Sequence, residues 1–90
     1  MNEPSSLQAT LGSDGLWHID VRGLPPPLPM VQILELVQRL PRDATLIVHH
    51  ERDPVWLYPE LLERGWWADV IDGEPGEVRL RIVHATPRAA

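Results

Sequence analysis

Two kinds of hydrophobic pattern follow one another along the chain. Alternating apolar and polar residues over Leu16–Val21 and Glu77–Val83 predict half-buried strands. A mostly apolar run at Ala44–His50 predicts a central strand, and Trp66–Ile71 predicts a further one. Between the first strand and the central one, apolar residues at helical spacing from Met30 to Leu40 predict an amphipathic helix.

Prolines and a glycine mark where the helices begin and end. Pro29 fits the first position of the first helix, where its missing N–H costs nothing, and Pro41 ends that helix. Pro59 cannot continue a helix begun at Pro54 without losing a hydrogen bond. A second helix is therefore predicted at about Pro59–Arg64, with Gly65 as its stop.

The order of these elements predicts the fold class. Alternation at Leu7–Leu11 followed by the turn residues Gly12–Gly15 indicates a short hairpin. The order β-α-β-α-β-β then predicts an α+β two-layer sandwich: a mixed four-stranded sheet, to which an N-terminal strand can add, with two helices on one face. We expect one domain over residues 7–84, a disordered segment at 1–6 and a flexible tail at 85–90.

Charge and composition exclude several classes of function. The net charge of -5 opposes general nucleic-acid binding, which needs a basic surface. The absence of cysteine excludes disulfides, thiolate metal sites and a cysteine nucleophile. No apolar run approaches the roughly 20 residues of a membrane helix, and no signal peptide is visible, so we expect a cytoplasmic protein without membrane contact. The oligomeric state stays open.

Several segments carry a resemblance to known proteins. The stretch Ile19–Met30 (IDVRGLPPPLPM) resembles the start of the TusA/SirA-like sulfur-carrier superfamily, in which a Cys-Pro-x-Pro segment begins the first helix. The segments His50–Pro54, Leu57–Leu61 and Glu63–Trp66 resemble a cysteine-less branch, the domain-of-unknown-function 2249 (DUF2249) family. The resemblance implies the β-α-β-α-β-β fold of that superfamily and brings no established activity.

The chain departs from the superfamily at the residue that carries its chemistry. Pro27 and Pro29 match its two prolines, and Pro26 stands at the cysteine position. A persulfide carrier needs a thiolate sulfur, which proline lacks and no other residue replaces. Sulfurtransferase chemistry by that mechanism is therefore excluded.

The edge where the first two core strands end is the strongest candidate for a binding site. In open α/β sheets, ligands bind outside the carboxyl ends of parallel strands, and a helix amino end there favours anions. The candidate ligand- or partner-binding residues are Arg22, Gly23, Pro26, Pro27, Pro29, His50, Arg52 and Asp53, with Glu51 between them. The alternative is structural: Arg22 pairs with Asp20, Asp53 or a loop carbonyl, and Asp53 is only a cap.

The open face of the sheet is the second candidate. His18, His49, Arg79 and Arg81 project from it and could dock a protein or RNA, unless it is an ordinary solvated face. His49 and His50 are adjacent on a strand and so point to opposite faces. His18, His49 and His50 are weak metal candidates without a recognised ligand spacing, and hydrogen-bonded histidines are the alternative.

These observations favour a non-catalytic binding or regulatory module that recognises a protein partner or a small anionic ligand and needs no cofactor. The alternative is a metal-binding or redox-associated protein that uses surface histidines. No Ser-His-Asp arrangement, phosphate-binding glycine motif or carboxylate pair suggests an enzyme. Pro26–Pro29 also fits a proline-rich ligand, although helix entry explains the same residues. Of the neighbours Trp66 and Trp67, one is expected in the core and the other at the surface.

Overall fold

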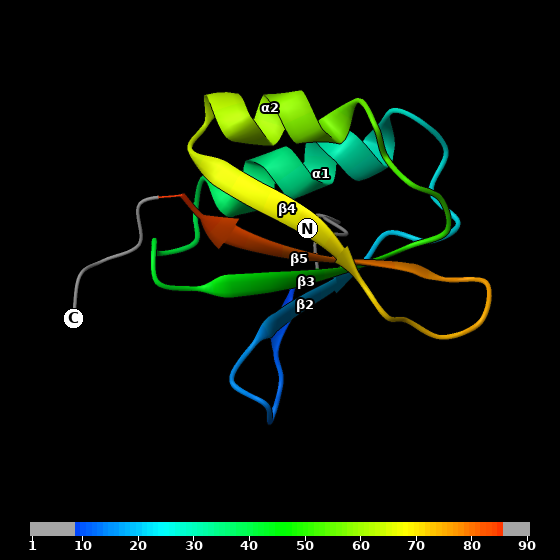
Figure 1. Cartoon of the computed structure of the whole chain (residues 1–90), viewed down its shortest axis with the longest axis horizontal. Coiled ribbons are helices and arrows are strands. Elements are labelled where there is room, and N and C mark those ends of the chain that lie inside the picture. Colours follow the sequence, from blue (N-terminus) through cyan, green and yellow to red (C-terminus); the bar gives the residue numbers. More distant parts are fainter. Residues whose placement is uncertain (1–8, 86–90) are drawn as a thin grey trace, which may run out of the picture.

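The computed structural model describes residues 9–85, which build a five-stranded sheet with two helices on one of its faces (Figure 1). The strand order is β1-β2-β3-β5-β4. The strands are β1 (Thr10–Leu11), β2 (Trp17–Asp20), β3 (Thr45–His50), β4 (Trp66–Ile71) and β5 (Val78–His84), and the helices are α1 (Leu28–Val37) and α2 (Leu57–Glu63). This confirms the predicted α+β sandwich, including the additional N-terminal strand.

The strand directions follow from the connections. β2 and β3 are joined through α1 and pair in parallel, as a helical crossover requires. β5 lies between β3 and β4 and pairs antiparallel with both, so the β4–β5 hairpin turns the last strand back into the middle of the sheet. The carboxyl ends of β2 and β3 consequently meet at one edge, beside the start of α1.

Both helices begin earlier than predicted. α1 starts at Leu28, one residue before Pro29, and its last helical residue is Val37 rather than Leu40. α2 starts at Leu57, two residues before Pro59, instead of at Pro59 itself. The physical reason is the same in both helices: the first turn of a helix leaves its N–H groups without intrahelical partners, so proline is tolerated at several first-turn positions.

The core lies between the helix layer and the sheet. Its buried side chains come from both helices, from the helix-facing positions of four strands and from the residue after β2: Ile19, Val21, Ile33, Leu36, Val37, Leu46, Val48, Leu57, Leu61, Trp66, Leu80 and Ile82. Trp66 is only 4% exposed and Trp67 is 55% exposed, so the predicted division of the tryptophan pair is confirmed. The period-2 pattern therefore assigned the faces of the strands correctly.

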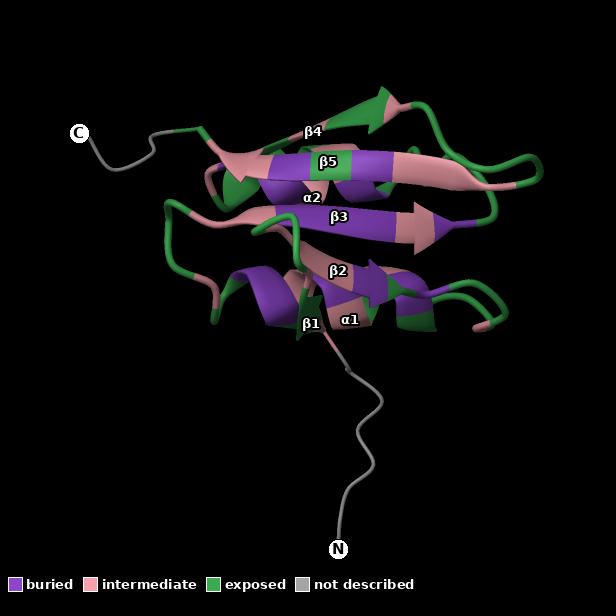
Figure 2. Ribbon diagram, turned by 90° about the horizontal axis from the view of Figure 1, so that it is seen from below, coloured by how far each residue is buried: buried purple, intermediate pink, exposed green. Residues whose placement is uncertain are grey.

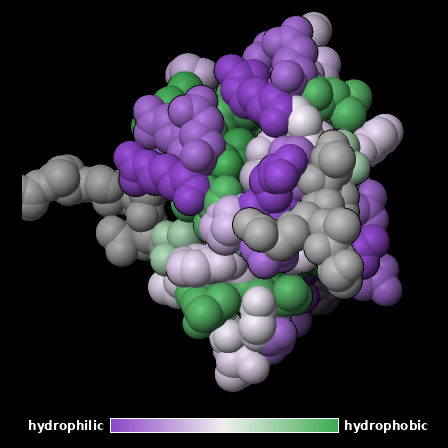
Figure 3. Space-filling view, turned by 90° about the vertical axis from the view of Figure 1, so that its left-hand side faces the viewer, coloured by the Kyte–Doolittle hydropathy of each residue, from purple (hydrophilic) through white to green (hydrophobic). Residues whose placement is uncertain are grey.

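The other face of the sheet has no helix over it (Figure 2). Residues Met1–Gln8 and Thr86–Ala90 lie outside the described residues, so the expectations of a disordered start and a flexible tail fall mostly there. No helix in the described part of the chain is long and apolar enough to cross a membrane. At the end of the molecule shown in Figure 3, hydrophilic side chains form the larger clusters and apolar side chains form small patches between them.

Gly65 ends α2 in the left-handed region, with φ at 87°. A Cβ atom at this position would meet the His84 ring at 3.2 Å, whereas at Gly15 (φ 81°) it would meet nothing within 4 Å. We therefore expect Gly65→Ala to lower the free energy of unfolding by about 1–2 kcal/mol. Gly15→Ala, which carries the same backbone strain without the contact, is expected to cost less. Urea denaturation of both variants measures the difference, and equal losses would show that the contact with His84 does not matter.

Candidate functional site

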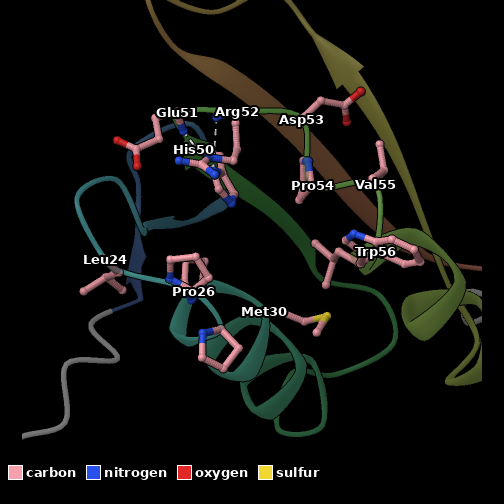
Figure 4. A pocket seen from close by; sticks show the side chains of 13 residues that line it. Leu24, Pro26, Met30, His50, Glu51, Arg52, Asp53, Pro54, Val55 and Trp56 are labelled. Atoms are coloured by element: carbon pink, nitrogen blue, oxygen red, sulfur yellow. Dashed lines mark hydrogen bonds between the residues drawn. The ribbon is translucent and has the colours of Figure 1, made fainter.

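A cavity of about 460 Å³ opens at the edge where β3 ends and α1 begins. Its walls are the proline loop before α1 and the segment that joins β3 to α2. The lining residues are Leu24, Pro26, Pro27, Pro29, Met30, His50, Glu51, Arg52, Asp53, Pro54, Val55, Trp56 and Leu57 (Figure 4). Six of the eight residues predicted from the sequence thus line one hollow, and most of the wall between them is apolar.

His50 supplies a polar group inside this apolar wall. The residue is 5% exposed, and its Nδ1 accepts hydrogen bonds from the backbone N–H groups of Glu51 (2.9 Å) and Arg52 (3.3 Å). Burial lowers the pKa of His50, which keeps the ring neutral. A neutral imidazole that accepts at Nδ1 carries its proton on Nε2. The free edge of the ring therefore offers an N–H donor on the cavity side (Figure 4).

The amino end of α1 forms the facing wall. The first α-helical bond runs from the N–H of Val31 to the carbonyl of Pro27, and no side chain caps the helix. Pro29 has no N–H group, and within residues 9–85 the N–H of Met30 has no hydrogen-bond acceptor. The N–H of Met30 is thus a hydrogen-bond donor at the positive end of the helix dipole, and both favour an anion here.

Charged side chains stand at the rim. Within the described part of the chain, the guanidinium group of Arg52 makes no hydrogen bond or ion pair. Asp53 accepts a hydrogen bond from the Tyr58 hydroxyl, and burial together with this contact raises the pKa of Tyr58. Asp53 is therefore bound to a side chain of α2, whereas the charge of Arg52 remains available.

Arg22 and Gly23 lie outside the cavity. Arg22 donates from Nε (2.9 Å) and from a terminal nitrogen (2.7 Å) to the two carboxylate oxygens of Asp20. This bidentate contact is the main cause that lowers the pKa of Asp20. Gly23 has φ at 86°, which allows the turn between β2 and the proline loop. Arg22 is therefore paired with a neighbouring carboxylate, as the structural alternative expects, and does not face the cavity.

The open face holds a second polar group, arranged around two histidines. His18 and His49 meet across β2 and β3, with Nδ1 of His18 3.1 Å from Nε2 of His49. The outer nitrogen of each ring contacts a carboxylate: Asp14 at 3.1 Å from His18, and Glu77 beside His49. His18 and His49 thus share the open face on neighbouring strands, and His50 points to the opposite face.

Arg79 and Arg81 also lie on the open face, but each pairs with its own carboxylate. Arg79 contacts Glu77 at 3.0 Å, and Arg81 contacts Asp69 at 2.9 Å. The side chain of Glu77 is only 1% exposed, and Arg79 is the main cause that lowers the pKa of Glu77 to about 2. Each arginine on this face is therefore held beside a carboxylate.

Glu77 and Asp14 were absent from the sequence-based site. Glu77 directly precedes β5 and lies on the same face as Arg79, and Asp14 precedes His18 by four residues. The register of β5 against β3 brings Glu77 to His49. Arg79 lies opposite His49 and Val78 lies opposite His50, so Glu77, which directly precedes β5, is a diagonal neighbour of His49. Among residues 9–85, no group of three or more histidine or carboxylate side chains is arranged to hold a metal ion.

Comparison with protein-family models matches residues 18–84 to the family described as uncharacterized conserved protein (DUF2249). The chain belongs to the DUF2249 family. Among curated proteins, none matches this chain. The matched DUF2249 region runs from His18 to His84. It includes the cavity and, of the polar group on the open face, His18, His49 and Glu77 but not Asp14.

Proposed function

We propose that this DUF2249 chain is a non-catalytic binding module that holds a small anionic ligand with an apolar body in the cavity at the end of β3. The observation that carries the proposal is His50: a buried, neutral imidazole whose Nδ1 is occupied by backbone donors and whose Nε2–H faces an apolar hollow. A buried donor without a partner is costly, and a ligand oxygen removes that cost.

The size and lining of the cavity define the chemistry of the ligand. A volume of about 460 Å³ falls within the range of small-molecule sites, which are mostly apolar with a few placed polar groups. Prolines and Met30 suit an aliphatic or aromatic body. His50, the Met30 N–H and Arg52 suit one carboxylate or a similar anionic head. The nearby acid Glu51 opposes a highly charged head, so we expect a monoanion.

Trp56 lies at the mouth of the cavity, where its fluorescence can report on a bound ligand. Trp56 is 80% exposed although it lines the cavity, so its indole stands at the mouth of the cavity rather than in the core (Figure 4). A bound apolar body would bring Trp56 out of water. The same exposed indole would also suit a side chain from a protein partner, which is the competing form of this proposal.

We also propose that the scaffold is of the TusA/SirA-like type and that the protein acts in the cytoplasm. The element order and the position of Pro27 and Pro29 at the start of α1 support the scaffold. Pro26 then lines the cavity at the position where a sulfur carrier keeps its thiol. In this proposal the cavity binds a ligand and does not transfer sulfur.

Titration with short monocarboxylates tests the proposed function. We expect hexanoate and benzoate to change the fluorescence of Trp56 and to shift the amide signals of Met30 and Arg52, while the neutral amides of the same acids bind more weakly. Arg52→Gln should weaken binding about tenfold, because a charged hydrogen bond is worth roughly 1.5–3 kcal/mol.

Arg22→Gln is the matched control, since it removes the same charge from a residue outside the cavity. Its affinity should stay within about twofold of the native value. Equal weakening by the two substitutions would point to general charge attraction and would contradict a site at the cavity. If no carboxylate shifts these amide signals while a protein partner does, the docking form of the proposal replaces the small-ligand form.

A further inference from the structure

The outer edge of β4 is open to pairing with another strand. Among residues 9–85, β5 is the only strand that pairs with β4, which stands at one side of the sheet (Figure 2). β1, at the other side, has two residues, whereas β4 has six. Proteins usually block a long edge strand with proline, lysine or a bulge. β4 (WWADVI) contains neither residue, and its register against β5 runs without a bulge.

The pairing with β5 shows which backbone groups of β4 point outward. The N–H of Ala85 donates to the carbonyl of Gly65 at 2.7 Å, and the register places these two residues opposite each other. Hydrogen-bonded and non-hydrogen-bonded pairs alternate along an antiparallel ladder. Every second residue of β4 therefore turns its N–H and C=O groups away from β5: Trp66, Ala68 and Val70. Within the described part of the chain, these outward groups have no hydrogen-bond partner.

The exposed side chains of β4 suit contact with another protein strand. Trp67 on the open face and Val70 on the helix-facing side are both more than half exposed. Asp69 is the one charged residue of the strand, and its Oδ2 accepts a hydrogen bond from Arg81 at 2.9 Å. The negative charge at this edge is thus already balanced, and a strand that approaches it meets an apolar surface.

We propose that β4 pairs antiparallel with β4 of a second copy of this chain, about a two-fold axis at Ala68, so that two five-stranded sheets join into one. In this register Ala68 lies opposite Ala68 of the second copy, and Trp66 lies opposite Val70 of the second copy. All the outward residues of both strands then exchange backbone hydrogen bonds. A shift of two residues in either direction leaves one outward residue of each strand without a partner in the other strand.

The side chains make this strand complementary to itself. Trp67 comes opposite Asp69 of the second copy in a non-hydrogen-bonded pair, in which side chains are closest. Oδ2 of Asp69 is bound to Arg81, so Oδ1 accepts from the indole N–H of Trp67 across the interface. The Arg81 guanidinium beside the same indole adds a cation–π contact. The axis repeats both contacts, whereas the register centred on Asp69 would place two like charges opposite each other.

The assembly ends at two copies and is weak. The joined sheet has β1 at both of its edges, and a strand of two residues offers little for a third copy to pair with. A six-residue strand buries less surface than a standard protein interface, and the net charge of -5 on each copy opposes association. We therefore expect a dissociation constant on the order of 100 μM.

Sedimentation equilibrium of the full chain from about 10 μM to about 1 mM tests the dimer. Trp67→Glu should raise the dissociation constant at least about tenfold, because it removes the indole and places a carboxylate opposite Asp69 of the second copy. Trp56→Glu is the matched control: it makes the same change at an exposed tryptophan outside β4 and should stay within about twofold of the native value. Far-UV circular dichroism shows that both variants are folded.

Amide hydrogen exchange locates the interface. The amides of Trp66, Ala68 and Val70 should exchange more slowly at about 1 mM than at about 10 μM in the native chain, and at equal rates in Trp67→Glu. A native chain that stays monomeric at about 1 mM overturns the proposal, even if an unrelated extended peptide pairs with β4. A dimer that leaves these amides unprotected, or that Trp56→Glu weakens as much as Trp67→Glu, also overturns it. β4 contributes no residue to the cavity lining, so these outcomes are independent of the proposed ligand.

Discussion

Leu61→Ala is expected to lower the free energy of unfolding by about 3 kcal/mol, because it leaves a hole at the contact between α2 and the sheet. Leu61 is 0% exposed and belongs to the core together with Trp66 and Leu80. α2 has only seven residues, so its stability comes from this packing rather than from its own hydrogen bonds. Chemical denaturation followed by far-UV circular dichroism measures the loss.

Leu62→Ala provides the matched control within the same helix. Leu62 is 49% exposed, and the substitution removes the same atoms from a solvent-facing position. Its effect should stay within about 0.5 kcal/mol. If both variants lost the same stability, burial would not explain the cost, because alanine has a higher helix propensity than leucine, and the assigned core face of α2 would be wrong.

The fold was largely predictable because its determinants are local. Period-2 alternation in β2 and β5 assigned both faces of the sheet, and helical spacing identified α1. The helix starts were misplaced by one or two residues because proline was assigned only to the first helical position. Pro59 lies in the first turn of α2, where the missing N–H does no harm.

The candidate site was predictable only where neighbouring segments build it. The rule that ligands bind at the carboxyl ends of parallel strands placed the cavity between the proline loop and His50. The rule does not predict which arginine keeps a guanidinium group that is free to bind a ligand. Arg22 pairs with Asp20 two residues away, whereas Arg52 has no such partner within residues 9–85. Trp56 also escaped prediction, because its exposure depends on how the loop before α2 turns.

Partners that come from distant strands could not be predicted from the sequence. Glu77 and His49 are 28 residues apart, and they meet because β5 inserts between β3 and β4. Sequence alternation gives the face of Glu77 but not its neighbour. The same insertion buries the Glu77 side chain beside Arg79, so a residue of the β4–β5 turn becomes a central part of the open face.

Glu77→Gln is expected to lower the free energy of unfolding by about 2 kcal/mol at neutral pH, the second-largest effect we foresee. The carboxylate accepts hydrogen bonds from Arg79, from the backbone N–H of Glu74 and from His49, and its side chain is 1% exposed. The neutral amide keeps the shape but loses the charge that Arg79 and the backbone N–H stabilise. Urea denaturation in metal-free buffer measures the difference.

The pH dependence of this loss follows from the direction of the pKa shift. Folding lowers the pKa of Glu77 from its ordinary value of 4.5 to about 2, chiefly through the Arg79 hydrogen bonds. Its contribution is therefore fully present above about pH 5 and is lost as the pH falls toward 2. The difference in the free energy of unfolding between the native chain and Glu77→Gln should therefore shrink across this range.

Glu60→Gln, which removes an exposed partner of Arg64, is the control and should change the free energy of unfolding by less than about 0.5 kcal/mol throughout. A constant gap between the native chain and Glu77→Gln from pH 7 to pH 3 would show that the side chain acts through its shape and not through its charge.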